Sequence, residues 1–327
     1  MVLILRESDV RGLLSMDEVI EAVEEAFLEK AAGQAQMPAK IYLYYSRYDG
    51  DLRVMPAYLE GLDISAVKVV NVHPGNRRFG LPSVMATIIL VDPQTGEPLS
   101  IISGAWITAM RTGGASGVAT KHLARKGSKN LGIIGAGVQA ETQLLAVSRV
   151  ADLEQVKVFD MDEARKRDFA HRQAENHRGV EILPAETAQD AVTGMDILVT
   201  VTPARSPIVR NEWVEPGLHI NAIGADAPGK EELDPMILKR AKIVVDDWDQ
   251  ASHSGEVNMP LAKRMIRREN IYAELCEVVS RRKPGRESDE EITVFDATGL
   301  AILDAITAKL VYKRAVDLGR GQEIDLL

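Results

Sequence analysis

The sequence predicts an α/β fold in which a smaller α+β region precedes a parallel sheet covered by helices. Two observations lead to this prediction. From Asn130 onward, short apolar runs alternate with amphipathic helical patterns, as in parallel sheets that are buried on both faces. Before that point, a helical pattern is followed by closely spaced β-type runs with a turn sequence between two of them, which is typical of antiparallel strands.

Length, charge and cysteine usage exclude several classes of protein. The 327 residues are enough for two domains, and the interspersed charges, with a net charge of −9, argue against a nucleic-acid partner. No apolar run reaches the length of about 18 residues that indicates a membrane span, and the initial run VLIL is too short for a signal peptide and predicts a first strand. Since Cys276 is the only cysteine, we expect a cytoplasmic protein without an intrachain disulfide. The six histidines show no metal-ligand spacing, so no metal site is expected.

The first region opens with an amphipathic helix over residues 15–31. Ser15 is its expected N-cap, with Glu18 three positions on. The β-type runs that follow lie at 40–46, 52–59, 64–74, 84–92 and 99–103. The stretch DPQTGEP at 92–98 predicts a turn between two of them. Residues 108–124 have helical spacing despite three glycines, and such small residues let a helix approach another backbone or a ligand closely.

The second region alternates strands and helices. Its apolar runs lie at 131–134, 156–159, 180–183, 197–201, 218–223 and 242–245, and its helical patterns at 138–149, 162–176, 186–194 and 234–241. Residues 292–299 predict one more strand, and we expect the final helix to return to the first domain. The predicted domains are therefore residues 1–114 with 304–327, and residues 115–303.

A glycine-rich turn follows the first apolar run of the second region. Gly135, Gly137 and Ala140 form G-x-G-x-x-A between a strand and a helix, the context that separates a dinucleotide-binding motif from a chance pattern. Gly135 permits the sharp turn, Gly137 lets backbone N–H groups approach a pyrophosphate, and Ala140 keeps the helix close to the strand. The sequence thus predicts a Rossmann dinucleotide-binding domain. The alternative is a structural turn in an α/β domain that binds no nucleotide.

An acidic residue at the end of the next strand indicates which dinucleotide binds. Asp160 lies 25 residues after Gly135, and Arg165 follows one helical turn later. A carboxylate at this place accepts hydrogen bonds from the adenosine ribose hydroxyls and repels a 2′-phosphate. The predicted cofactor is therefore NAD rather than NADP.

The loop after the fifth strand of this region carries a candidate acid/base residue. Asp226 lies among small residues in INAIGADAPGKEELD. Ligands of open α/β sheets bind beyond the carboxyl ends of the strands, so a carboxylate facing nicotinamide could act as a general base or hold an ammonium group. A role in a turn or cap is the alternative.

Three cations of the first domain lie in apolar or small-residue surroundings. Arg53, Lys68 and Arg111 each need a partner or a ligand if they are buried, and the planar guanidinium of Arg111 suits a carboxylate. The alternative is that each extends its charged end to solvent from a sheet edge. His73, in NVHPGN, is more typical of a loop histidine than of a catalytic one.

The sequence resembles the ornithine cyclodeaminase/μ-crystallin family over nearly its whole length, and within it the archaeal NAD-dependent L-alanine dehydrogenases. The matching stretches are GDLRVMPAYL, KVVNVHPGN, GLPSVMATIILVDPQTGEPL, MRTGGASGVATKHLA, GIIGAGVQA, WVEPGLHINAIGADAPGKEELD and ESDEEITVFDATGLAILDA. This resemblance implies a homodimer joined through the sheets of its N-terminal domains. It also implies a C-terminal helix that packs on that domain.

The resemblance also implies roles for individual residues. Arg53, Lys68 and Arg111 would hold the substrate carboxylate, and Asp226 with Lys68 would carry out catalysis. The residues assigned to cofactor binding are Arg111, Thr112, Gly135, Ala136, Gly137, Val138, Gln139, Asp160, Arg165, Thr202, Gly224, Ala225 and Asp226.

The implied reaction is the reversible, NAD-dependent oxidative deamination of a small L-amino acid, above all L-alanine to pyruvate and ammonia. Ornithine cyclisation to proline and reduction of a cyclic imine such as Δ1-pyrroline-2-carboxylate are alternatives. Cyclising members of the family carry a glutamate where this chain has Arg53, a cation that would repel the second ammonium of ornithine. A dinucleotide-dependent binding protein without turnover, like μ-crystallin, is the alternative from another class. That branch usually lacks an acid at the position of Asp226 and prefers NADP.

Overall fold

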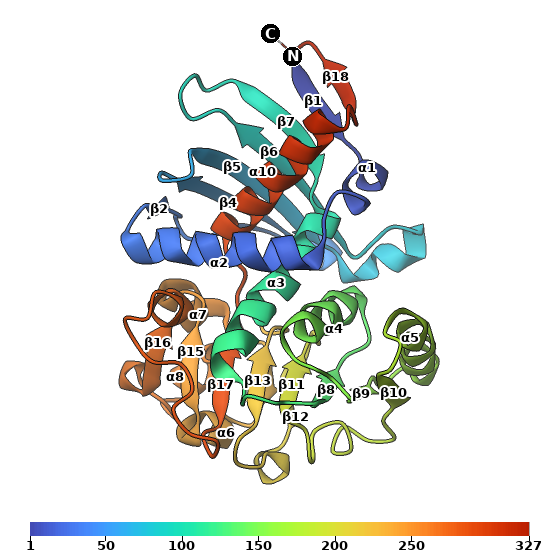
Figure 1. The fold of residues 1–327 in the computed structure, drawn as a ribbon, viewed down its shortest axis with the longest axis vertical. Helices are drawn as coiled ribbons and strands as arrows, with labels where there is room; N and C mark the ends of the chain where they lie inside the picture. The colour runs from blue at the N-terminus through green and yellow to red at the C-terminus, as the bar shows by residue number, and fades with distance from the viewer. Residues whose placement is uncertain (327) are drawn as a thin grey trace. The chain divides into compact units, whose positions relative to one another are not determined.

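The computed structural model describes residues 1–326 and divides into two compact units (Figure 1). The first comprises Met1–Thr112 and the chain from Leu300 onward, and the second comprises Gly113–Gly299. The boundaries expected from the sequence lay at residues 114 and 304. The assignment of substrate binding and dimerisation to the first domain, and of NAD binding to the second, remains a prediction.

The first unit contains a mainly antiparallel sheet, as the sequence predicted. Its order is β18-β1-β7-β6-β5-β4-β2, and β3 also pairs with β4. Among the described strands, β1 and β7 pair in parallel and the other neighbours pair antiparallel. The bounds are β1 (Val2–Leu5), β2 (Ala35–Gln36), β3 (Ile41–Tyr45), β4 (Gly50–Leu59), β5 (Ile64–Val72), β6 (Val84–Val91), β7 (Pro98–Ser103) and β18 (Gln322–Ile324).

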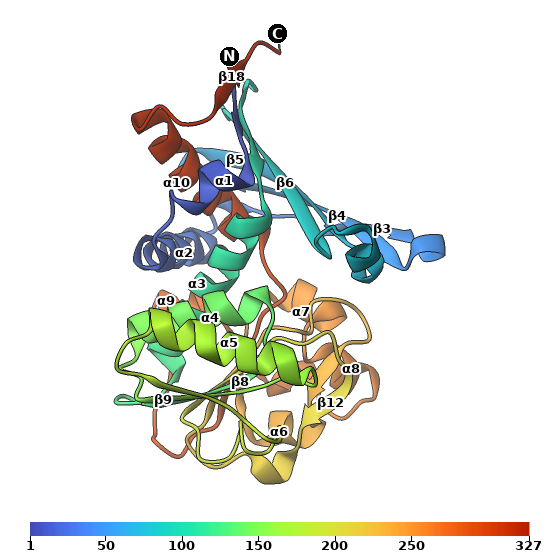
Figure 2. The ribbon, with the colours of Figure 1, turned by 90° about the vertical axis from the view of Figure 1, so that its right-hand side faces the viewer.

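Two long helices lie on one face of this sheet, α2 (Met16–Ala32) and α10 (Ala301–Asp317), as Figure 2 shows. The side chain of Ser15 caps α2 by accepting from the N–H of Glu18, as predicted. The end of α10 is held to the first unit, because Arg314 Nη1 donates to the carbonyl of Leu13 at 3.0 Å. The short helix α1 (Glu7–Arg11) and the 3₁₀ turns η1 (Ser46–Tyr48) and η2 (Pro74–Phe79) complete the unit, and the unit boundary falls within α3 (Ala105–Leu123).

The second unit contains a parallel sheet of order β10-β9-β8-β11-β13-β17-β15-β16. The strand order reverses between β8 and β11, as at the switch point of a Rossmann fold, so the predicted fold class is confirmed. The bounds are β8 (Asn130–Ile134), β9 (Gln155–Phe159), β10 (Glu181–Pro184), β11 (Ile197–Thr200), β13 (His219–Ala222), β15 (Lys242–Val245), β16 (Ile271–Glu274) and β17 (Thr293–Asp296). A separate pair, β12 (Arg205–Val209) and β14 (Glu231–Leu233), is also parallel.

Helices follow most of the strands of this parallel sheet, and its central strands are buried on both faces. Every residue of β11, β13 and β17 is buried, which explains their continuous apolar patterns. The helices are α4 (Val138–Val150), α5 (Glu163–Asn176), α6 (Pro235–Arg240), α7 (Trp248–Ser254), α8 (Asn258–Ala262) and α9 (Leu275–Val279), with 3₁₀ turns η3 (Asn211–Trp213) and η4 (Arg268–Asn270).

The helix predicted at 186–194 is wrong. These residues form hydrogen-bonded turns instead. The carboxylate of Asp190 accepts from the backbone N–H of Thr187 at 3.0 Å and from its hydroxyl at 2.8 Å. Gly194 has a φ of 73°, outside the helical region. Short polar side chains that bond the local backbone compete with helix formation, and a glycine in the left-handed region ends it.

Candidate functional site

Two of the predicted cations lie on the face of the first sheet that α10 covers. In the β4–β5 register, Arg53 pairs with Val70 and Met55 pairs with Lys68. Side chains alternate along a strand, so Arg53 and Lys68 are diagonal neighbours on one face. Both are buried, and Lys68 is only 1% exposed.

A buried carboxylate joins Lys68 to Arg111. Asp304, in the first turn of α10, has Oδ2 2.6 Å from Lys68 Nζ and Oδ1 2.9 Å from Arg111 Nε. All three side chains are buried, and buried charges need partners of opposite sign. Asp304 was not among the residues predicted from the sequence, although an acid within the apolar stretch LAILDAI was a visible signal.

The environment of Lys68 lowers its pKa from 10.5 to about 7. Burial is the main cause, and repulsion by Arg111 and Lys40 adds to it, while attraction to Asp304 opposes it. Lys40 is a further cation near this cluster that the sequence analysis did not single out. A lysine with this pKa can exchange a proton near neutral pH.

Arg53 has a different carboxylate partner from Lys68 and Arg111. Its Nε and Nη2 donate to the two carboxylate oxygens of Asp51 at 2.9 and 3.1 Å, and its guanidinium lies 5.4 Å from the centre of the Tyr42 ring. Thr112, assigned to the cofactor phosphates, donates its hydroxyl to the carbonyl of Thr108 one turn earlier in α3.

In the second unit, the glycine turn has the backbone that a dinucleotide site requires. Gly135 has a φ of 107°, and a Cβ there would lie 2.9 Å from the carbonyl oxygen of Val201. Gly137 is the N-cap of α4, and a Cβ on it would meet no atom within 4 Å. An exposed helix N-terminus without a capping side chain fits a bound phosphate. Val138 is exposed beside it, and Gln139 is half-buried.

Asp160 is fixed to the glycine turn. Its Oδ2 accepts from the N–H of Ala136, and its Oδ1 accepts from the N–H of Asp162, both at 2.9 Å. Arg165, predicted one helical turn away, has Nη1 within 3.5 Å of both Asp160 oxygens and Nη2 3.1 Å from Asp162 Oδ2. A carboxylate can accept about four hydrogen bonds, so a ribose hydroxyl at Asp160 would take the place of the long 3.5 Å contacts from Arg165.

Asp226 is paired with a lysine that the sequence analysis did not assign. Lys230 Nζ forms an ion pair with Asp226 Oδ1 and lies 3.3 Å from the carbonyl oxygen of Gly224. The Asp226 side chain is 34% exposed, so a ligand can reach it. The sequence signal for this pair was that Asp226 and Lys230, which carry opposite charges, are four residues apart.

A buried glutamate ties together two of the loops assigned to the cofactor. Glu232 accepts from the N–H and hydroxyl of Thr202, both at 2.7 Å, and from the N–H of Gly224 at 2.9 Å. Burial raises the pKa of Glu232, and these hydrogen bonds oppose the rise. The Thr202 hydroxyl therefore donates its hydrogen bond to Glu232. Ala225, which follows Gly224, is buried.

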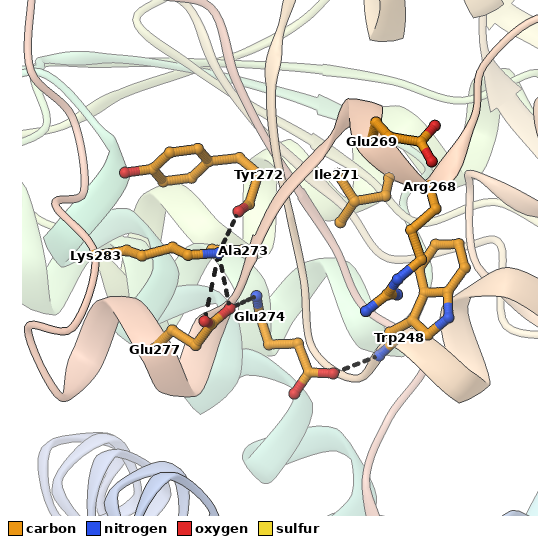
Figure 3. A pocket seen from close by; sticks show the side chains of 9 residues that line it. All are labelled: Trp248, Arg268, Glu269, Ile271, Tyr272, Ala273, Glu274, Glu277 and Lys283. Atoms are coloured by element: carbon orange, nitrogen blue, oxygen red, sulfur yellow. Dashed lines mark hydrogen bonds and ion pairs between the residues drawn. The ribbon is translucent and has the colours of Figure 1, made fainter.

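A pocket of about 260 Å³ lies along β16, at one edge of the second sheet (Figure 3). Arg268 stacks over the Trp248 ring at 4.0 Å, and Lys283 Nζ donates to the carbonyl of Tyr272 at 2.7 Å. The predicted site residues are not among those that line it.

Residues 1–326 contain neither a metal-binding cluster nor a membrane-spanning helix. No group of His, Cys, Asp and Glu side chains in this range is arranged to hold a metal ion. No helix in the same range has the length and hydropathy needed to cross a membrane.

Comparison with known proteins gives full-length matches. The model of the ornithine cyclodeaminase/mu-crystallin family matches residues 2–319. An alanine dehydrogenase of Archaeoglobus fulgidus is 50% identical over 322 residues, 98% of each chain. The solved structure of an archaeal alanine dehydrogenase dimer with bound NAD has a TM-score of 0.95 at 49% identity, covering 100% of this chain and 99% of that one. The Δ1-pyrroline-2-carboxylate reductase of Thermococcus litoralis, solved with NADH and L-proline, has a TM-score of 0.96 at 46% identity, covering 99% and 100%.

Proposed function

The chain belongs to the ornithine cyclodeaminase/mu-crystallin family, and on this basis we propose that it is an NAD-dependent oxidoreductase of small L-amino acids. Its proposed reaction is the reversible deamination of L-alanine to pyruvate and ammonia. The similarity to alanine dehydrogenases over the whole chain supports this choice.

The observation that carries the proposal is the buried group formed by Lys68, Asp304 and Arg111. Asp304 engages Arg111 through Nε, which leaves the two terminal nitrogens of the guanidinium for a substrate carboxylate. Lys68, with its pKa near 7, would bind the same carboxylate when charged and exchange a proton when neutral. Held in this way, the substrate's α-carbon is fixed for reaction.

Asp226 is the proposed acid/base residue of the second unit. Its partly exposed carboxylate would take a proton from the substrate ammonium, release that proton to solvent, and then accept a proton from the water that attacks the imine. Lys230 would orient this carboxylate, because it contacts both Asp226 and the backbone of Gly224.

The glycine turn and Asp160 would hold NAD, with the N-terminus of α4 facing its phosphates and Asp160 facing a ribose. Bound NAD supplies the hydride acceptor for the amino acid's α-carbon. The open space at Gly137 supports this assignment.

Reduction of Δ1-pyrroline-2-carboxylate to proline is the second candidate. The reductase from Thermococcus litoralis is 46% identical and matches over nearly all of both chains. A cyclic imine carries the same carboxylate beside the carbon that exchanges hydride, so the cluster of Lys68 and Arg111 would suit it equally.

We also propose a homodimer joined through the first sheet. The face opposite α10 is apolar and exposed in part. Ile41 and Leu43 of β3 are 59% and 53% exposed, and their register partners Val54 and Leu52 share that face. Large exposed apolar surfaces of this kind mark association sites. The cytoplasmic location expected from the single cysteine stays a prediction.

The product profile tests the proposed function. The protein is incubated with NADH and either pyruvate with ammonia or Δ1-pyrroline-2-carboxylate, and with NAD⁺ and either alanine or ornithine, while NADH absorbance and ammonia are followed. NADH and ammonia from alanine support the proposal, and faster reduction of the cyclic imine favours the second candidate. Ammonia from ornithine without net NADH would establish a cyclodeaminase. Cofactor binding without any turnover would overturn the proposed activity.

A further inference from the structure

We infer that Asn258 is a positioning residue for Asp226 and acts on it through Lys230, an inference that rests on the proposed acid/base role of Asp226. Asn258 is the first residue of α8 and is only 7% exposed. It follows Lys230 by 28 residues, and the fold brings the two together.

The carboxamide of Asn258 holds two consecutive backbone groups of the loop that carries Asp226. Its Oδ1 accepts from the N–H of Gly229 at 3.1 Å, and its Nδ2 donates to the carbonyl of Lys230 at 3.0 Å. Nδ2 also donates to the carbonyl of Gly255 at 2.5 Å, within its own segment. Asn and Gln are the residues that carry a carbonyl oxygen and an NH₂ group on one planar side chain. These contacts therefore fix the end of the loop from which the Lys230 side chain starts.

Lys230 transmits this constraint to Asp226. Its Nζ forms an ion pair with Asp226 Oδ1 and lies 3.3 Å from the carbonyl oxygen of Gly224, at the start of the same loop. Gly229 has a φ of 79°, so the backbone turns sharply just before Lys230. A shift of this backbone would move the ammonium, and the Asp226 carboxylate would lose the orientation that proton transfer requires.

The segment that contains Asn258 is itself anchored to the parallel sheet. Asp296, the last residue of β17, accepts from the N–H groups of Glu256 and Val257 at 2.8 and 3.1 Å. Glu256 in turn accepts from the N–H of Leu233 in β14 at 2.7 Å. Buried polar groups that are satisfied in this way rigidify a structure. Asn258 is therefore a fixed point against which the loop is held.

A double-mutant cycle with Lys230 tests the inference. Asn258→Ala removes both contacts to the loop, so kcat for alanine should fall about tenfold, the scale of one buried hydrogen bond, while KM and the Kd for NAD⁺ stay within about twofold. Lys230→Met should lower kcat by at least as much. Because both changes act on Asp226 along one path, the double variant should be no slower than Lys230→Met alone.

Asn270→Ala is the matched control for the cycle. Asn270 is exposed, and its Oδ1 likewise accepts from a backbone N–H, that of Arg267 at 2.8 Å. Its removal should change none of the three constants. If Asn258→Ala fails to fold by circular dichroism, Asn258→Asp takes its place in the cycle. The aspartate keeps the acceptor for the N–H of Gly229 and loses the donor to the carbonyl of Lys230.

The cycle separates positioning from a general structural role. A double variant about tenfold slower than Lys230→Met would show two independent effects and overturn the inference. A loss spread over kcat, KM and NAD⁺ affinity would overturn it as well, because it would indicate a damaged fold.

Hydrogen exchange tests the anchor without turnover. The backbone amides of residues 224–230 should exchange faster in Asn258→Ala than in the wild type, and those of β13 should exchange at the same rate. No increase in the loop would overturn the inference, whatever the activity. Wild-type protein that turns over neither alanine nor the cyclic imine contradicts the proposed function itself. Normal wild-type turnover with an unchanged kcat in Asn258→Ala contradicts only the inference.

Discussion

Asp304 Oδ2 lies 2.6 Å from Lys68 Nζ, and both side chains are buried. The two residues are 236 positions apart in the chain and meet because α10 returns to the first sheet. Asp304 opposes the fall in the pKa of Lys68 that burial causes, so it keeps part of the lysine population charged near neutral pH. It also fixes Arg111 through Nε.

Asp304→Asn is therefore expected to weaken substrate binding. Without the carboxylate, the pKa of Lys68 should fall from about 7 to a lower value, and fewer molecules would carry the cation that holds the substrate. We expect the KM for alanine to rise about tenfold at pH 7.5, the scale of one hydrogen bond to a charged group. The rise of KM with pH should also begin at lower pH than in the wild type.

Steady-state kinetics from pH 6 to 9 check this expectation. Asp317→Asn, at the exposed end of the same helix, is the matched control and should leave the profile in place. An unchanged KM profile in Asp304→Asn would show that Asp304 does not act on Lys68 during substrate binding.

Asp226→Asn tests the acid/base assignment. The amide cannot take a proton from the substrate ammonium, so kcat should fall by about 10²-fold or more, the usual contribution of a general base. The Kd for NAD⁺, measured by calorimetry, should stay within about twofold, because the amide keeps the size of the side chain. Near-normal turnover would contradict the assignment. Loss of NAD⁺ binding would indicate that Asp226 holds the cofactor instead.

Asp160→Ser should relax the preference for NAD. Removing the carboxylate removes the repulsion of a 2′-phosphate and leaves Arg165, now within 3.5 Å of Asp160, to pair with that phosphate. We expect the ratio of kcat/KM for NAD to that for NADP to fall about tenfold or more. Adding Arg165→Ala should abolish the gain with NADP. An unaltered ratio in Asp160→Ser would refute the role of this carboxylate.

The parts of the molecule that depend on local sequence were predictable. The strand–turn–helix around Gly135, the cap of α2 at Ser15 and the buried parallel strands each have a short-range signal in residue type and periodicity. The segment 186–194 was misread because its apolar spacing suited a helix, while Asp190 and Gly194 favoured turns.

The partners of the charged residues could not be predicted in the same way. Asp304 meets Lys68 only through the return of α10, and Glu232 meets Thr202 across 30 residues. Such contacts follow from the topology and leave no spacing pattern in the sequence. Asp51 and Lys230 are nearer in sequence to Arg53 and Asp226, but charged pairs at short spacing are common on protein surfaces. The residue types alone did not mark these two as partners of site residues.

Substitution by alanine should have different effects at Gly132 and Gly137, two glycines near the dinucleotide turn. A Cβ on Gly132 would lie 1.9 Å from the carbonyl oxygen of Ala191, so Gly132→Ala should destabilise the fold by about 1–3 kcal/mol. A Cβ on Gly137 meets nothing within 4 Å, and its φ of −87° suits any residue. Gly137→Ala should therefore keep its stability and bind NAD⁺ more weakly. Urea denaturation and calorimetry separate the two effects, and weakened stability in both variants would mean that Gly137 serves packing.

The buried Asp296 should make stability depend on pH. Its pKa is raised from 3.8 to about 8, mainly by burial and also by the nearby Asp246, while hydrogen bonds from the N–H groups of Glu256 and Val257 oppose the rise. In the unfolded chain this carboxyl loses its proton near pH 4, whereas in the fold it keeps the proton up to about pH 8. The folded state therefore binds more protons within this window, and the contribution of Asp296 to stability falls as pH rises through it.

Asp296→Asn isolates this contribution, because the amide does not titrate. Groups that do not interact with Asp296, including Lys68 and the buried His219, titrate in both proteins and cancel in the comparison. Glu256 does not cancel, because the charge of Asp296 helps to raise its pKa. The amide also loses one acceptor for the two N–H donors, so the variant should be less stable than the wild type at pH 5. That difference should shrink as pH rises from about 5 to 8, since only the wild type must then take up a proton at residue 296 when it folds. Urea denaturation at each pH measures both unfolding free energies. Parallel curves would show that Asp296 ionises in the fold as it does in the unfolded chain, while a difference that widens with pH would reverse the sign of the argument.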